Sequence, residues 1–168
     1  MRLQYSMIIF GYGNPSRGDD ALGPALLARL AQQPKKGTGI ARLALVEAIQ
    51  LQLEHALELF GQDLVLFIDA SISGPVPFGF HRLAAEQDTS FTTHALSPAE
   101  LLHVYEQIGQ GRAPPSYQLS VRGEDFSLGA PLSAPAKRHL EEAYAFVRML
   151  CAVPQAVAWE RHVDENAT

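Results

Sequence analysis

The segment MIIFGYGNPSRGDDALGP, residues 7–24, constrains the fold more than any other part of the chain. Its apolar run, residues 7–10, is typical of a β-strand buried on both faces, and the turn Gly11-Tyr12-Gly13 follows directly. A helix should begin between Asp19 and Pro24, because aspartate caps free N–H groups and proline is tolerated in a first turn. A buried strand that passes through a glycine turn into a helix is the opening unit of an α/β protein.

The rest of the chain continues this alternation. Further strands are predicted at residues 41–47, 64–69, 77–83 and 117–121, with helical patterns between them. Residues 77–83 follow the preceding strand too closely for a parallel crossover, so that strand should run antiparallel to residues 64–69. We therefore expect a three-layer α/β/α sandwich whose five-stranded sheet is mostly parallel with one antiparallel strand. Residues 1–153 should form a single domain, and residues 154–168 a loose C-terminal tail.

The spacing of apolar residues predicts the buried face of each helix. The third helix should begin at a capping box formed by Ser97 and Glu100, and the fourth should be capped by Ser133. The expected buried faces are Leu22, Ala25, Leu26 and Leu30 in the first helix; Leu53, Ala56, Leu57 and Phe60 in the second; Leu101, Val104, Tyr105 and Ile108 in the third; and Leu140, Ala143, Tyr144, Val147 and Cys151 in the fourth.

Composition excludes several classes of function. The 13 basic and 18 acidic residues give a net charge of -5, which disfavours nucleic acid as a partner because phosphate backbones need clustered positive charge. The apolar runs are far shorter than the ~20 residues of a membrane span. The single cysteine, Cys151, allows neither an intrachain disulfide nor a cysteine metal cluster. We expect a cytoplasmic protein with no membrane partner.

The glycine turn fits dinucleotide binding poorly. The fingerprint G-x-G-x-x-G requires a third glycine where this chain has Ser16. Asp19 and Asp20 would also occupy the helix N-terminus and repel a pyrophosphate. Helix capping explains one of these aspartates. It accounts less well for a second aspartate in a loop that should face the ligand crevice.

Two further residues should lie at the same sheet edge as Asp20. Asp69 ends a strand of five apolar residues, and His94 precedes the third helix on a loop that returns to this edge. Neighbouring buried carboxylates are costly unless a proton or a cation joins them. Two carboxylates and an imidazole suit a divalent ion such as Ni, Zn or Mn. Each residue taken alone also has an ordinary structural interpretation, and the remaining histidines and Cys151 have weaker claims to a site: His55, His81, His103, His139 and His162.

These residues resemble the hydrogenase maturation protease family, the endopeptidases that trim the C-terminus of [NiFe]-hydrogenase large subunits. The family pattern G-x-G-N-x-x-x-x-D-D/E-x-x-G matches residues 11–23, and H-x-L-x-x-A-D/E-x-L matches residues 94–102. An aspartate that ends the third strand matches Asp69. Residues 117–123 and 129–133 also follow the family, and the likeness extends from about residue 6 to 150.

The resemblance implies an α/β/α fold and a metal site formed by Asp20, Asp69 and His94. The metal is the nickel already present in the substrate, the precursor of the [NiFe]-hydrogenase large subunit, and another divalent cation is the alternative in the isolated protein. Asp20 and Asp69 are also the candidate catalytic residues. With Asp20 as a ligand, Asp19 is the expected cap of the first helix. The chemical step stays open between a metal-polarised carbonyl or water and a carboxylate general base.

One departure and three alternatives accompany this resemblance. The family often carries a D-G-G-T-like segment after the second strand, where this chain has Glu47-Ala48-Ile49-Gln50, so the identity of the client hydrogenase is open. A non-catalytic nickel or metal chaperone could use the same ligands. G-x-G-N-P also opens peptidyl-tRNA hydrolase, but the acid pair and the negative net charge disfavour a tRNA substrate. A serine hydrolase is disfavoured because the chain has no G-x-S-x-G elbow.

Overall fold

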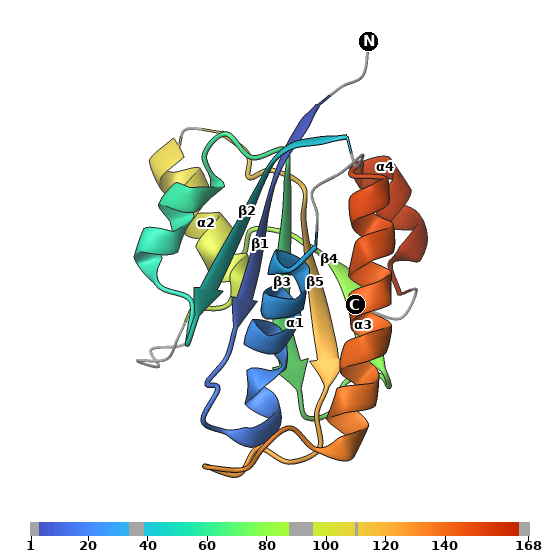
Figure 1. Cartoon of the computed structure of the whole chain (residues 1–168). Helices are drawn as coiled ribbons and strands as arrows, with labels where there is room; N and C mark the ends of the chain where they lie inside the picture. The colour runs from blue at the N-terminus through green and yellow to red at the C-terminus, as the bar shows by residue number, and fades with distance from the viewer. Residues whose placement is uncertain (1–3, 34–38, 88–95, 110, 165–168) are drawn as a thin grey trace.

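A computed structural model describes residues 4–33, 39–87, 96–109 and 111–164. Its five-stranded sheet has the order β2-β1-β3-β5-β4 (Figure 1). The four parallel strands are β1 (Tyr5–Tyr12), β2 (Ile40–Ala48), β3 (Leu64–Ser71) and β5 (Ser116–Arg122), and β4 (Phe78–Leu83) is antiparallel to β5. Helices α1 (Leu22–Ala31) and α3 (Ala134–Ala152) cover one face, while the 3-10 helix η2 (Leu53–Leu59) and α2 (Pro98–Gly109) cover the other. The predicted three-layer α/β/α fold is confirmed.

Alternation along β1 creates the two cores. Met7 and Ile9 belong to the core under α1 and α3, whereas Ile8 and Phe10 belong to the core under η2 and α2. Tyr12 continues the second row and packs against its core. The carboxyl end of β1 therefore carries a tyrosine on the face of the sheet that η2 and α2 cover.

The predicted antiparallel strand is present but has a different neighbour. β4 pairs with β5 along its whole length, with Phe80 opposite Leu119, and β5 separates it from β3. The short connection from β3 excluded a parallel neighbour but did not exclude a strand placed one position further out. Packing favours this outer position, because the Phe80 ring stacks on the Tyr117 ring of β5 with centroids 5.4 Å apart.

Two of the predicted helix faces need correction. In η2 the buried residues are Ala56 and Leu59, while Leu53 and Leu57 are 61% and 63% exposed. A 3-10 helix has about three residues per turn, so the α-helical spacing selected the wrong side. In α2, Leu102 is buried beside Leu101, whereas Ile108 is 52% exposed near the end of the helix. The predicted capping box is confirmed, since Ser97 Oγ accepts the Glu100 N–H at 3.2 Å and Glu100 Oε2 accepts the Ser97 N–H at 2.6 Å.

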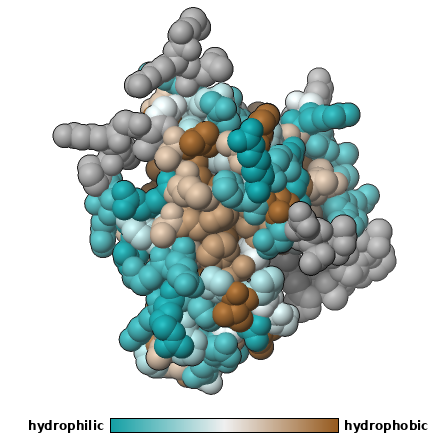
Figure 2. All heavy atoms as spheres, turned by 90° about the vertical axis from the view of Figure 1, so that its right-hand side faces the viewer, coloured by the Kyte–Doolittle hydropathy of each residue, from teal (hydrophilic) through white to brown (hydrophobic). Residues whose placement is uncertain are grey.

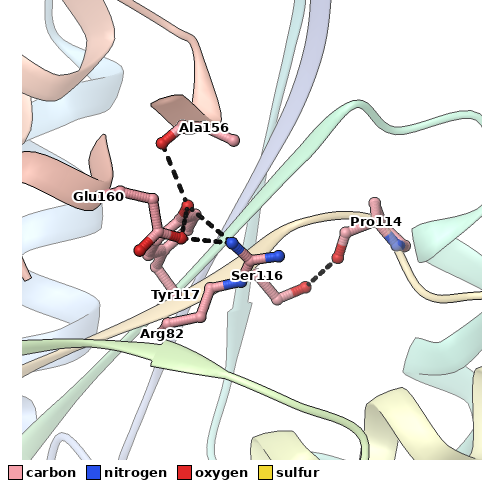
Figure 3. A network of polar contacts seen from close by, with 6 residues as sticks. All are labelled: Arg82, Pro114, Ser116, Tyr117, Ala156 and Glu160. Atoms are coloured by element: carbon pink, nitrogen blue, oxygen red, sulfur yellow. Dashed lines mark hydrogen bonds and ion pairs between the residues drawn. The ribbon is translucent and has the colours of Figure 1, made fainter. Parts of the chain in front are cut away.

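The C-terminal segment is packed rather than loose as far as Asp164. Short helices α4 (Ala156–Trp159) and η3 (Glu160–His162) place Trp159 in the core, 1% exposed, with its indole N–H bonded to Leu150 O and Val153 O at 3.0 Å. The Tyr117 hydroxyl donates to Glu160 Oε1 at 2.8 Å (Figure 3). The prediction of a loose tail is thus wrong for residues 154–164. The sequence did not reveal this packing because a single buried aromatic side chain leaves no periodic pattern. Residues 165–168 lie outside the described residues.

The C-terminal segment also closes one edge of the sheet. Asp164 N–H donates to Phe80 O at 2.9 Å, and Asp164 Oδ2 accepts the Phe80 N–H at 2.8 Å. The surface that includes α3 and α4 mixes apolar and polar side chains (Figure 2). Exposed apolar residues in and beside these helices are Met149, Val153 and Val157. In the described part of the chain, no helix has the length and apolar character needed to cross a membrane.

Candidate active site at the carboxyl edge of the sheet

The loop after β1 holds Asp20 against the end of that strand. Asp20 lies in the 3-10 turn η1 (Gly18–Ala21), and its Oδ2 accepts the Asn14 N–H at 2.7 Å. Gly13 has φ +146°, and a Cβ at this position would lie 2.0 Å from Asp20 O. Only glycine allows the loop to fold back so closely. The predicted glycine turn therefore holds the Asp20 carboxylate close to the end of β1.

Asp19 has a different environment from its neighbour. It is fully buried; its Oδ2 accepts the N–H groups of Glu124 and Asp125 and the Ser133 hydroxyl, and its Oδ1 accepts the Ser133 N–H, at 2.6–3.0 Å. Burial alone would raise the pKa of Asp19, but these hydrogen bonds together hold the pKa below its ordinary value. The prediction that Asp19 caps the first helix is wrong, since its side chain bonds the loop before α3 instead.

Asp69 is the buried carboxyl at the end of β3. Its Oδ1 accepts the Ser120 hydroxyl at 2.9 Å, and its Oδ2 accepts Gln118 Nε2 at 3.0 Å and the Tyr12 hydroxyl at 3.3 Å. Burial, with a smaller contribution from the charge of Asp20, raises the pKa of Asp69 to about 6 against the opposing effect of these hydrogen bonds. A negative charge on Asp20 thus disfavours ionisation of Asp69.

Sequence reasoning missed the side chains that surround Asp69. Tyr12 is part of this group, and burial followed by the charge of Asp69 raises its pKa well above the ordinary value, so its phenol stays protonated and can donate. Gln118 and Ser120 alternate along β5, and Ser120 pairs in register with Asp69. The available signal was the polar alternation of β5, which places both residues on one face, but its register against β3 was not readable.

The third predicted ligand, His94, lies outside the described residues. The helix that follows it, α2, covers the face of the sheet to which Tyr12 belongs. Among the residues that the structure describes, no three His, Cys, Asp or Glu side chains come close enough together to hold a metal ion. The metal site formed by Asp20, Asp69 and His94 therefore stays a prediction.

Three of the weaker candidates, His55, His139 and Cys151, have structural surroundings. His55 Nδ1 accepts the Gln52 N–H at 2.8 Å, so this histidine helps to begin η2. His139 Nδ1 lies 2.7 Å from Arg122 O. Burial raises the pKa of Cys151 to about 11, which keeps the thiol protonated and unreactive at neutral pH.

Several solved structures with the same architecture bear the names of hydrogenase maturation enzymes. The [NiFe] hydrogenase maturation protease HycI from Thermococcus kodakarensis aligns with a TM-score of 0.64 and 22% identity, over 88% of this chain and 93% of that one. The hydrogenase maturating endopeptidase HybD from E. coli aligns with a TM-score of 0.64 and 18% identity, over 86% and 91%. The endopeptidase HycI from Escherichia coli gives 0.63 and 18%, over 86% and 90%. The chain has the fold of the hydrogenase maturation proteases.

The resemblance inferred from the motifs is thus confirmed by the fold. Searches against family models and against curated proteins found no match. At these identities the alignments establish the fold, and the chemistry has to be argued from the residues of this chain. Those residues place two carboxylates of unlike environment at the carboxyl edge of β1 and β3, which is where ligands bind in open α/β sheets.

Proposed function

We propose that this protein is an endopeptidase that removes the C-terminal extension of a [NiFe]-hydrogenase large-subunit precursor after nickel insertion. The observation that carries the proposal is the position of Asp20 after β1 and of Asp69 at the end of the adjacent strand β3, at the carboxyl edge of a maturation-protease fold. The solved structures it resembles bear the names of hydrogenase maturation enzymes, and the charge interaction between the two aspartates gives this chain a reason to attract a cation. A cytoplasmic location belongs to the same proposal.

In this proposal the nickel is part of the substrate, and Asp20, Asp69 and His94 are its ligands. Carboxylate and imidazole groups together suit borderline divalent ions. The charge of Asp20 raises the pKa of Asp69, and a cation between the two carboxylates would remove that penalty. Another divalent cation could occupy the same ligands in the isolated protein.

Two routes for the chemical step are compatible with these residues. In the first, the nickel of the precursor polarises the scissile carbonyl or a water molecule. In the second, Asp69 accepts a proton from water, the water oxygen attacks the carbonyl carbon, and the proton passes to the leaving amine as the C–N bond breaks. A pKa of about 6 keeps most of Asp69 ionised at pH 7.5, as a general base requires. Both routes give a shortened precursor and a free C-terminal peptide.

The test is to mix the purified protein with nickel-loaded and nickel-free precursor and to weigh the products by mass spectrometry. We expect loss of a C-terminal peptide from the loaded form alone. Asp20→Asn and Asp69→Asn should abolish the cleavage. Asp63→Asn is the matched control, because Asp63 stands just before the opposite end of β3 and its Oδ2 accepts the Ser6 N–H at 2.7 Å.

Three results would contradict the proposal. If a cognate, nickel-loaded precursor binds but stays intact, the chain is a metal chaperone. If both precursor forms are cut equally, nickel has no part in recognition. If Asp20→Asn and Asp69→Asn process the precursor at the wild-type rate, the two carboxylates are not the site.

A further inference from the structure

We propose that Gln118 and Tyr12 are positioning residues that hold Asp69 Oδ2 and leave Asp69 Oδ1 as the one oxygen that acts on the substrate. The part of this inference that concerns the substrate rests on the proposed function. The part that concerns the orientation of the Asp69 carboxylate does not. It assigns a task to two side chains that lie outside the predicted ligand set.

A count of acceptor sites distinguishes the two oxygens. A carboxylate offers about four lone pairs, two on each oxygen. Oδ2 receives two donors, Gln118 Nε2 at 3.0 Å and the Tyr12 hydroxyl at 3.3 Å, and is therefore saturated. Among the described residues, Oδ1 receives one donor, the Ser120 hydroxyl at 2.9 Å. Within this part of the chain, one lone pair of Oδ1 is left for a proton or a cation.

The donors are themselves fixed by each other. Gln118 Nε2 lies 3.4 Å from the Tyr12 oxygen, so its two N–H groups reach both the phenol and the carboxylate. Tyr12, Asp69 and Gln118 come from the strands β1, β3 and β5, which are neighbours in the sheet. A side chain held by groups on rigid strands keeps its orientation better than one held by loops.

Asp20 repeats the arrangement on a smaller scale. Its Oδ2 accepts the Asn14 N–H at 2.7 Å, and its Oδ1 makes no hydrogen bond to a described residue. Among the described residues, each aspartate thus has one oxygen that receives fewer hydrogen bonds than the other and keeps acceptor capacity. Hydrogen bonds to the remote oxygen of a ligating carboxylate orient it and are costly to remove.

The test compares two deletions with a matched control. Gln118→Leu removes the amide donor with little change of volume, and Tyr12→Phe removes the hydroxyl but keeps the ring. Tyr117→Phe is the control, because Tyr117 lies next to Gln118 on β5 and its hydroxyl also donates to a carboxylate, Glu160 Oε1 at 2.8 Å, away from the site (Figure 3).

Cleavage kinetics on nickel-loaded precursor separate orientation from docking. We expect Gln118→Leu and Tyr12→Phe to lower kcat about 10–100-fold with KM within twofold, and Tyr117→Phe to change neither. Wild-type kcat in both site variants, or a rise in KM at unchanged kcat, would overturn the inference.

Crystal structures of the same variants give a readout that does not depend on activity. The Asp69 carboxylate should turn about its Cβ–Cγ bond, or occupy two orientations, in Gln118→Leu and Tyr12→Phe, and should stay in place in Tyr117→Phe. An unmoved Asp69 in both site variants overturns the positioning role even if the wild-type protein cleaves. A turned Asp69 in a protein that never cleaves would support the positioning role while the proposed function fails.

Discussion

Asp69→Asn should make the metal-free protein more stable at neutral pH while abolishing its cleavage activity. Burial raises the pKa of Asp69 from its ordinary 3.8 to about 6. Because the folded state then binds the proton more tightly than the unfolded state, stability falls as the pH rises from about 4 to about 6. A shift of about two pH units corresponds to roughly 3 kcal/mol. Asparagine does not ionise, so the folded variant does not bear the free-energy cost of a buried carboxylate charge.

Part of the gain is lost because an amide has one acceptor oxygen where the carboxylate has two. An asparagine oxygen can accept the Ser120 hydroxyl, but its NH₂ group then faces the amide of Gln118, which has to reorient. We therefore expect a net gain of about 1–2 kcal/mol at pH 7.5 and none at pH 4, where the wild-type carboxyl is protonated.

Urea unfolding of wild type, Asp69→Asn and Asp63→Asn at pH 7.5 and pH 4, with a chelator present, measures this difference. Asp63→Asn controls for the loss of a carboxylate next to the opposite end of β3. A variant that is less stable than wild type at both pH values, or whose gain persists at pH 4, would show that the pKa of Asp69 is not raised. A site residue that lowers stability while serving activity is the expected form of a stability–activity trade-off.

Three further perturbations probe the frame around the site. Asp19→Ala should lower the free energy of unfolding in urea by about 3–5 kcal/mol, because buried donors at Glu124, Asp125 and Ser133 lose their acceptor. Since the pKa of Asp19 is lowered in the folded state, the stabilisation by Asp19 exists above about pH 4 and is lost as the pH falls further. Gly13→Ala should lower Tm and cleavage together, whereas Gly111→Ala, whose Cβ meets open space, should leave both unchanged. Trp159→Ala should lower the free energy of unfolding by about 3–5 kcal/mol, because the indole is buried. Unchanged stability would instead support the prediction of a loose C-terminal tail.

Local signals made most of the fold predictable. The apolar runs of β1 and β3 and the glycine turn after β1 are short-range patterns, and parallel strands end at one sheet edge. The proximity of Asp20 and Asp69 follows from those patterns without knowledge of any long-range contact. Their motif context also identified the fold family that the solved structures confirm.

The missing parts depend on contacts between distant segments. The bonds of Gln118 and Ser120 to Asp69 require the register of β5 against β3, and the partners of Asp19 lie more than 100 residues away in the sequence. The burial of Trp159 requires α4 to fold back on the sheet. No periodicity within a single segment encodes any of these pairings, so a sequence pattern could name the aspartates but not their surroundings.

The two adjacent aspartates show why their surroundings decide their roles. Asp19 accepts four donors and has a lowered pKa, so it is a permanent anion with its charge already satisfied by the protein. Asp20 accepts one donor among the described residues and retains acceptor capacity next to a second carboxylate. By joining η1 to the loop before α3, Asp19 fixes the turn from which Asp20 projects. The two negative charges that argue against a phosphate-binding loop therefore have different roles. Asp19 is a structural anion and Asp20 is a candidate ligand, and the bonds of Asp19 help to place Asp20.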